Sequence, residues 1–101
     1  MKNKKKRLYL ALLALKTEDE CRKFLRDLLT EAEIDEFSNR WTVAQMLFRN
    51  TSYEEITKKT NMSSTTIARI SKWLYKGMGG YKLMLNRLNL NEKHHTSLRG
   101  V

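Results

Sequence analysis

Three helix-start signals constrain the fold of this chain more than any other feature of the sequence. Thr17, Thr30 and Ser52 are each followed three residues later by a glutamate, the spacing of a capping box at a helix N-terminus. The 101 residues include no proline and only 4 glycines, a composition that favours helices over turn-rich β folds. The sequence therefore predicts an all-α protein.

Apolar residues recur at helical spacing between these signals, which predicts up to six helices. We expect them over residues 8–15, after Thr17, after Thr30, after Ser52, from Ser64 to about Lys76, and from Tyr81 to Leu88. The chain is then one helical domain over residues 8–88, because a chain of this length suits a single domain. We expect a basic tail over residues 1–7 and a flexible tail over residues 89–101, where the apolar periodicity is lost.

The first predicted helix, Leu8 to Leu15, is apolar on two faces. With MKNKKKR before it, the run resembles the start of a secretory signal peptide, but no small-x-small cleavage site follows and it is too short to span a bilayer. We therefore expect a helix that is buried on both sides. In so small a protein, the second side fits a partner subunit.

The net charge of +9 is distributed unevenly along the chain. Residues 1–7 carry +5 and residues 8–55 carry −4, whereas residues 56–101 carry +8, from nine basic residues and one acidic residue. Such a polarised field indicates an anionic partner. Nucleic acid is the first candidate and an acidic membrane surface is the second. We predict no membrane partner, because the leucines of residues 8–15 have a better use in a dimer core.

The segment from Ser52 to Leu74 has the pattern of a helix-turn-helix: a short helix, a tight connection at Thr60-Asn61-Met62, and a second helix that Ser63 caps. Ile56 and Ile67 are expected to pack together beneath the crossing, with Met62 filling the corner. Ile70 and Leu74 are expected to attach the second helix to the body of the protein.

The outward face of the second helix combines short side chains with cations, which suits entry into a DNA major groove. Lysines that end the first helix are placed to hold the backbone. The predicted DNA contacts are Lys58, Lys59, Ser63, Ser64, Thr65, Thr66, Ala68, Arg69, Lys72 and Lys76. The alternative is a structural helical hairpin with a solvated basic face, in which the hydroxyl run at residues 63–66 is only a strong N-cap.

Residues 27–74, DLLTEAEIDEFSNRWTVAQMLFRNTSYEEITKKTNMSSTTIARISKWL, resemble the Trp repressor superfamily. The resemblance rests on the Leu-Leu-Thr opening, on Arg40 ten residues after Thr30, on the Ser-Tyr-Glu-Glu-Ile helix start and on the run Thr66-Ile67-Ala68-Arg69. The flanks resemble the small Trp repressor-related branch (YerC/YecD-like), and the likeness covers roughly residues 8–88. It implies an all-α bundle, an intertwined homodimer, and binding to a palindromic operator through two recognition helices.

The resemblance also implies a corepressor pocket, which this sequence alters. Arg40 and Arg69 stand where the family's arginines flank the bound indole, and Thr30 matches a pocket threonine. Ile70 and Trp73 replace the glycine and the serine that leave room for the ligand. We therefore expect a vestigial pocket that does not bind free tryptophan and that Trp73 itself fills. The alternative role of Arg40 is an ion pair with Glu33 or Glu36.

No grouping of residues predicts an enzyme, a metal site or a cofactor. Cys21 is the single cysteine and lies on an apolar stripe, so a packed thiol is expected, and His94-His95 lacks further metal ligands. The favoured function is a cytoplasmic, homodimeric transcriptional regulator that binds double-stranded DNA through residues 52–76, with repression as the expected outcome. The alternative is a helical dimeric interaction module that binds a protein partner or RNA.

Overall fold

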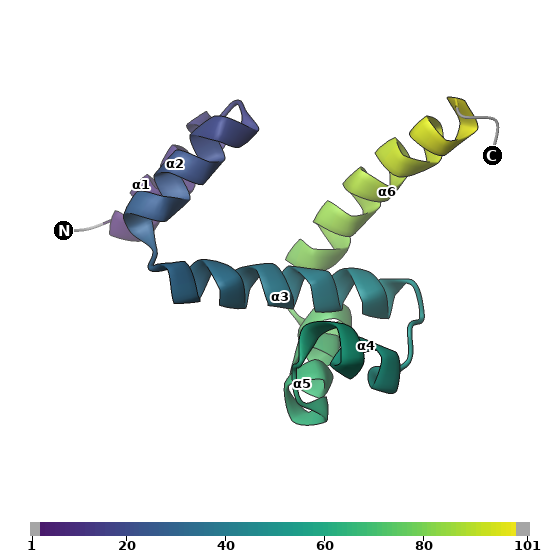
Figure 1. Ribbon diagram of the computed structural model, residues 1–101. Helices are drawn as coiled ribbons and strands as arrows, with labels where there is room; N and C mark the ends of the chain where they lie inside the picture. The colour runs from purple at the N-terminus through teal and green to yellow at the C-terminus, as the bar shows by residue number, and fades with distance from the viewer. Residues whose placement is uncertain (1–2, 99–101) are drawn as a thin grey trace. The chain divides into compact units, whose positions relative to one another are not determined.

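The computed structural model describes the backbone of residues 3–98 and the side chains of residues 3–89, and over this range α-helices are its only regular elements (Figure 1). The all-α prediction is confirmed, with helices close to the expected positions. In chain order they are α1 (Lys4–Ala14), α2 (Glu18–Leu28), α3 (Glu31–Phe48), α4 (Tyr53–Thr60), α5 (Ser64–Lys76) and α6 (Gly80–Leu98).

Side-chain caps begin four of these helices, as the sequence predicted. The hydroxyl of Thr17 accepts a hydrogen bond from the backbone N–H of Glu20 at 3.1 Å, and Ser52 accepts one from Glu55 at 3.2 Å. Thr30 makes the complete capping box, because its hydroxyl accepts from the Glu33 N–H at 3.1 Å while the Glu33 carboxylate accepts from the Thr30 N–H at 2.9 Å. Each cap satisfies backbone donors that the first turn of a helix leaves without a partner.

Residues with positive φ end two of the helices. Asn50, after α3, has φ 62°, and Asn61, after α4, has φ 61°, the left-handed conformation that asparagine tolerates better than most residues. Gly77 ends α5, and a Cβ atom there would collide with the carbonyl oxygen of Trp73. The close approach of these two backbone segments explains why the chain has glycine at this position.

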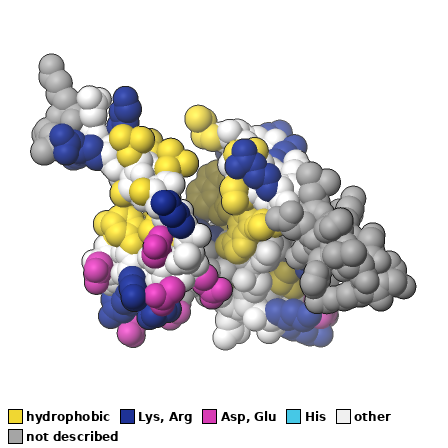
Figure 2. Space-filling model, turned by 90° about the horizontal axis from the view of Figure 1, so that it is seen from above, with side chains coloured by type: hydrophobic (Ala, Val, Ile, Leu, Met, Phe, Trp, Pro, Cys, Tyr) yellow, Lys and Arg dark blue, Asp and Glu magenta, His cyan; other side chains and the backbone are white. Residues whose placement is uncertain are grey.

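The chain divides into two compact units, residues 1–36 and 37–101, and the division falls within α3. In the first unit, α1 and α2 contain no buried residue. Leu13 is 79% exposed and Leu10 is 54% exposed, and Figure 2 shows apolar side chains at the surface of this unit, bordered by charged ones. The predicted stripe on α2 is present, but its Cys21, Phe24 and Leu25 are only half-buried.

The second unit holds the buried core of the described residues. α5 packs against both α4 and α6, and Figure 1 shows α4 and α5 side by side. The core lies among α3, α4, α5 and α6, and Met62 from the α4–α5 turn packs against it. Its buried members are Val43, Ala44, Leu47, Ile56, Ile67, Ile70, Leu74 and Leu85.

Two expectations about the chain ends differ from the structure. Residues 4–7, expected as a tail, form the first turn of α1, and residues 89–98, also expected as a tail, continue α6. The loss of apolar periodicity indicates that a segment has no face to bury, but it does not remove the helix propensity of Lys, Arg, Leu and Glu. The single helical domain over residues 8–88 stays a prediction.

Among the described residues, no helix is both long enough and apolar enough to cross a membrane.

Candidate nucleic-acid interface

The α4–α5 pair is held together by its turn as well as by its core. The hydroxyl of Thr60 donates to the carbonyl of Ile56 at 2.8 Å and accepts from the backbone N–H of Met62 at 3.3 Å. Asn61 reverses the chain between these two bonds, and the hydroxyl of Ser63 then accepts from the Thr66 N–H at 3.2 Å to begin α5. Three residues thus separate the two helices, as the sequence predicted for the motif at residues 52–76.

One face of α5 is buried and the opposite face is open to solvent. Ile67 and Ile70 are 0% exposed and Leu74 is 1% exposed, so these residues fix the rotation of the helix about its axis. Ile56 of α4 is also 0% exposed and belongs to the same core, which confirms the predicted packing beneath the crossing. With the inner face committed to the core, only the outer face of α5 is available to a partner.

The structure places nine of the ten predicted contact residues at the surface of the α4–α5 pair. Thr66 is half-buried, and its hydroxyl accepts a hydrogen bond from that of Ser63 at 3.1 Å. Ser63 and Thr66 therefore serve the cap, whereas Ala68 and Arg69 lie exposed one turn further along α5. The exposed residues are Lys58, Lys59, Ser63, Ser64, Thr65, Ala68, Arg69, Lys72 and Lys76.

The cations of this surface are mostly not neutralised within the protein. The ammonium group of Lys58 lies 3.7 Å from a carboxylate oxygen of Glu54, and both side chains are well exposed. No described acidic residue forms an ion pair with Lys59, Lys72 or Lys76. Glu54 offsets the charge of Lys58, whereas the charges of Lys59, Lys72 and Lys76 are left to attract an anionic partner.

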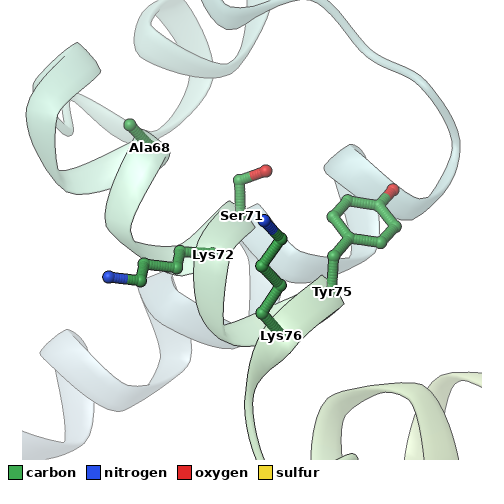
Figure 3. Close-up of a pocket in the computed structure, with 5 residues that line it drawn as sticks. All are labelled: Ala68, Ser71, Lys72, Tyr75 and Lys76. Carbon is green, nitrogen blue, oxygen red and sulfur yellow. The ribbon is translucent and has the colours of Figure 1, made fainter.

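The surface of α5 includes two residues, Ser71 and Tyr75, that were not among the predicted contacts. Ala68, Ser71, Lys72, Tyr75 and Lys76 line an open notch of about 350 Å³ on this helix (Figure 3). The ammonium group of Lys82, from the start of α6, lies 5.3 Å from the centre of the Tyr75 ring. The spacing i, i+3, i+4, i+7, i+8 from Ala68 was the signal that would have placed Ser71 and Tyr75 on the predicted face.

Arg40 and Trp73, two members of the predicted vestigial pocket, lie against each other. The guanidinium carbon of Arg40 is 5.7 Å from the centre of the Trp73 ring and 5.8 Å from that of Phe37, within the range of a cation–π interaction. Ile70, by contrast, is wholly buried in the core. Arg69 is exposed, and Thr30 belongs to the first unit, where it caps α3.

Aromatic rings continue from this contact along α3 and α6. Trp41 and Tyr81 stack with their ring centres 6.3 Å apart and their planes 17° from parallel. Burial raises the pKa of the Tyr81 phenol, while the positive charge of Arg40 opposes that shift. An open groove of about 550 Å³ is lined by Trp41, Trp73, Met78, Gly80, Tyr81 and Met84, and another of about 230 Å³ by Phe37, Arg40, Trp41 and Tyr81.

Within the part of the chain that the structure describes, no cluster of three His, Cys, Asp or Glu is placed to hold a metal ion. His94 and His95 lie outside the described side chains. Cys21 is a free, half-buried cysteine.

Comparison with known proteins identifies the family. The chain is 34% identical over 90 residues to the uncharacterized protein YerC of Bacillus subtilis (strain 168), which covers 89% of this chain and 86% of that protein. Its fold matches the crystal structure of a TrpR-like protein from Eubacterium eligens, with a TM-score of 0.80 and 38% identity, over 83% of this chain and 87% of that one.

It also matches the structure of a candidate Trp repressor from Staphylococcus aureus, with a TM-score of 0.79 and 33% identity, over 88% of this chain and 95% of that one. The sequence profile of the Trp repressor protein family matches residues 4–89. The resemblance seen in residues 27–74 is thereby confirmed: the chain belongs to the Trp repressor family, in its YerC-like branch.

Proposed function

We propose that this chain is a homodimeric, sequence-specific DNA-binding regulator of transcription that acts in the cytoplasm. Membership of the Trp repressor family supports the DNA-binding class. The observation that carries the proposal is the division of α5 into a buried inner face and an exposed outer face of hydroxyls and cations. We infer repression as its effect, since a dimer that occupies an operator excludes other proteins from that DNA.

The α4–α5 pair acts as a helix-turn-helix in this proposal, with α5 as the recognition helix. Ser64, Thr65 and Ala68 have short side chains, so the first half of α5 can approach the base edges of the major groove. Arg69 follows them and suits the bidentate contact that arginine makes with guanine. Lys58 and Lys59 at the end of α4, together with Lys72 and Lys76, neutralise backbone phosphates.

A second copy of the chain is the occupant we propose for the exposed apolar surface. α1 has no buried residue, and Leu8, Leu10, Leu12 and Leu13 are between 37% and 79% exposed. Contiguous apolar surface of this kind is uncommon on a protein that stays monomeric. A two-fold axis also gives the pair of α5 helices that a palindromic operator requires.

We propose in addition that free tryptophan is not the effector. The Arg40 guanidinium already lies on the Trp73 ring, so one of the two arginines that would flank an indole is engaged by the protein itself, while Arg69 stays exposed. Isothermal titration with L-tryptophan should give no heat of binding up to millimolar concentration. Saturable binding in the micromolar range would show that the pocket is functional.

Selection of bound duplexes from a randomised DNA pool tests the proposed function. A palindromic motif should be enriched, with half-sites about 34 Å apart centre to centre. The double variant Lys72→Ala/Lys76→Ala should abolish the enrichment, whereas Lys16→Ala/Lys23→Ala, which removes the same charge from the first unit, should not. Failure of the wild-type protein to enrich any duplex would instead favour the module that binds a protein partner or RNA.

A further inference from the structure

The notch on the second half of α5 has a composition that the base-reading role of this helix does not explain. Its lining combines two ammonium groups, two hydroxyl groups and one methyl group, from Lys72, Lys76, Ser71, Tyr75 and Ala68. Figure 3 shows Lys76 rising between Ser71 and Tyr75, whereas Lys72 extends to the other side of the helix. Tyr75 is 50% exposed, a large side chain left open among cations.

Anion binding fits this lining better than binding of an apolar ligand or a cation. No described carboxylate pairs with Lys72 or Lys76, and no described residue hydrogen-bonds the Ser71 hydroxyl. Residues 56–101 contain a single acidic residue, Glu92, against nine basic ones, so the surrounding chain supplies little internal competition for an anion. Hydroxyls and ammonium groups are the donors that proteins commonly aim at phosphate oxygens.

The shape of the notch selects among anions. Sites for small molecules are concave and enclose most of the ligand, whereas this notch of about 350 Å³ lies open along the outside of one helix. An anionic group that belongs to a longer chain passing over the helix fits such a surface. Ala68, at one end of the notch, also belongs to the predicted base-reading face, so the notch continues the surface proposed to meet DNA.

Lys82, from α6, contacts the Tyr75 ring that lines one side of the notch. Its ammonium group lies 5.3 Å from the centre of the Tyr75 ring, so α6 restrains a side chain of α5. The contact leaves the Tyr75 hydroxyl free to donate and brings a third lysine to this end of the site. Lys82 is therefore a positioning residue as well as a source of charge.

We propose that Ser71, Tyr75 and Lys76 bind one backbone phosphodiester of DNA, at the flank of the half-site that α5 contacts. This proposal rests on the proposed DNA-binding function. The hydroxyls of Ser71 and Tyr75 donate to the phosphate oxygens, while Lys76 supplies the charge. Lys72 contacts a neighbouring phosphate on the other side of the helix, and Lys82 holds the Tyr75 ring. The phosphodiester fixes how far α5 lies along the groove.

The test separates hydroxyl donation from charge by measuring affinity over a range of salt concentrations, on the duplex that the wild-type protein selects. Tyr75→Phe should weaken binding about threefold to tenfold, the usual range for one lost hydrogen bond, and leave the salt slope unchanged. Lys76→Gln should lower the slope by about 0.9, as expected when one phosphate is no longer neutralised. Tyr9→Phe and Lys23→Gln, which make the same changes in the first unit, should alter neither quantity.

The positioning role of Lys82 has its own readout. In a Lys82→Gln background the Tyr75→Phe penalty should shrink, because the ring is no longer held in place. An unchanged penalty in that background would show that Lys82 contributes charge alone and would remove it from the proposal.

Methylphosphonate substitution, one phosphate at a time, locates the contact. A single position per half-site should weaken wild-type binding and have a smaller effect on Tyr75→Phe. If Tyr75→Phe bound like the wild type, or if its penalty were the same at every substituted phosphate, the notch would not be a phosphate site. If poly-glutamate displaced the DNA as well as a random duplex does, the notch would be a general anion-binding surface. If the wild-type protein bound no duplex, the proposed function would fail, and this assignment with it.

Discussion

Both units of this chain are formed of α-helices, yet among the described residues only the second unit encloses a buried core. Residues 37–89 bury Ile56, Ile67 and Ile70 completely, whereas α1 and α2 of the first unit contain no fully buried residue. Both units have their helix caps in place, so the difference does not arise from local structure. Capping and apolar periodicity therefore specify where helices form. Whether the apolar face of a helix is buried depends on how many other helices surround it.

The largest expected effect comes from the core of the second unit. Ile67→Ala should lower the free energy of unfolding by about 2–5 kcal/mol, because it removes a wholly buried side chain and leaves a cavity. Ile67→Val, the matched smaller deletion, should cost only about 0.5–1.5 kcal/mol. Urea denaturation followed by circular dichroism measures both. Equal and small losses would mean that this core does not hold the unit together.

The second prediction tests whether a second copy covers the exposed leucines of α1 or whether they face solvent. Leu10→Glu/Leu13→Glu should raise the dimer dissociation constant at least ~100-fold, since two leucines would no longer be buried by the second copy. The unfolding transition of residues 37–89 should persist in the resulting monomer. Sedimentation velocity gives the dissociation constant, and Lys16→Glu is the control for added negative charge. A dimer as tight as the wild type would place the interface elsewhere.

The third prediction compares the loss of one helix cap from each unit in the monomeric variant Leu10→Glu/Leu13→Glu. Ser63→Ala should cost about 1 kcal/mol, because it leaves donors without a partner at the start of a helix that is anchored in the core. Thr17→Ala should leave the unfolding free energy unchanged, since the monomeric first unit has no core to lose. Chemical denaturation of the two triple variants compares them. Equal costs would show that the first unit folds cooperatively with the second even without a partner.

The smallest effect is a dependence of stability on alkaline pH. Burial raises the pKa of Tyr81 in the folded protein, so the protonated phenol is favoured by folding. Its contribution is present below the ordinary phenol pKa of about 10 and is lost as the pH rises through the raised value. Tyr81→Phe should flatten this part of the stability profile and remove a late component from the tyrosinate absorbance titration. If the lost absorbance came instead from the main component near pH 10, Tyr81 would be a fully solvated phenol.

Much of the fold followed from the sequence, because capping and core spacing are local signals. The Ser-x-x-Glu and Thr-x-x-Glu pairs located the starts of α2, α3 and α4, and the spacing of Ile67, Ile70 and Leu74 identified the inner face of α5. α1 begins earlier than the predicted Leu8, and α6 continues beyond the predicted Leu88. Helix propensity extends beyond the residues that pack, and periodicity reports only on packing.

The candidate site was only partly accessible to sequence reasoning. The outer face of α5 follows from its inner face, but the Tyr75–Lys82 contact joins two helices across the break at residues 77–79, and no spacing rule predicts it. The same holds for the Trp41–Tyr81 stack, which brings α3 and α6 together. Contacts between elements depend on how helices cross, which a single sequence does not state.

In the proposed assembly, the first unit completes its core with a second copy, so that two α5 helices meet one palindrome. Native mass spectrometry of the protein bound to its selected duplex tests this most directly. We expect two chains per duplex for the wild-type protein, and one chain per duplex with much weaker binding for Leu10→Glu/Leu13→Glu. A single wild-type chain on a full-affinity duplex would contradict it.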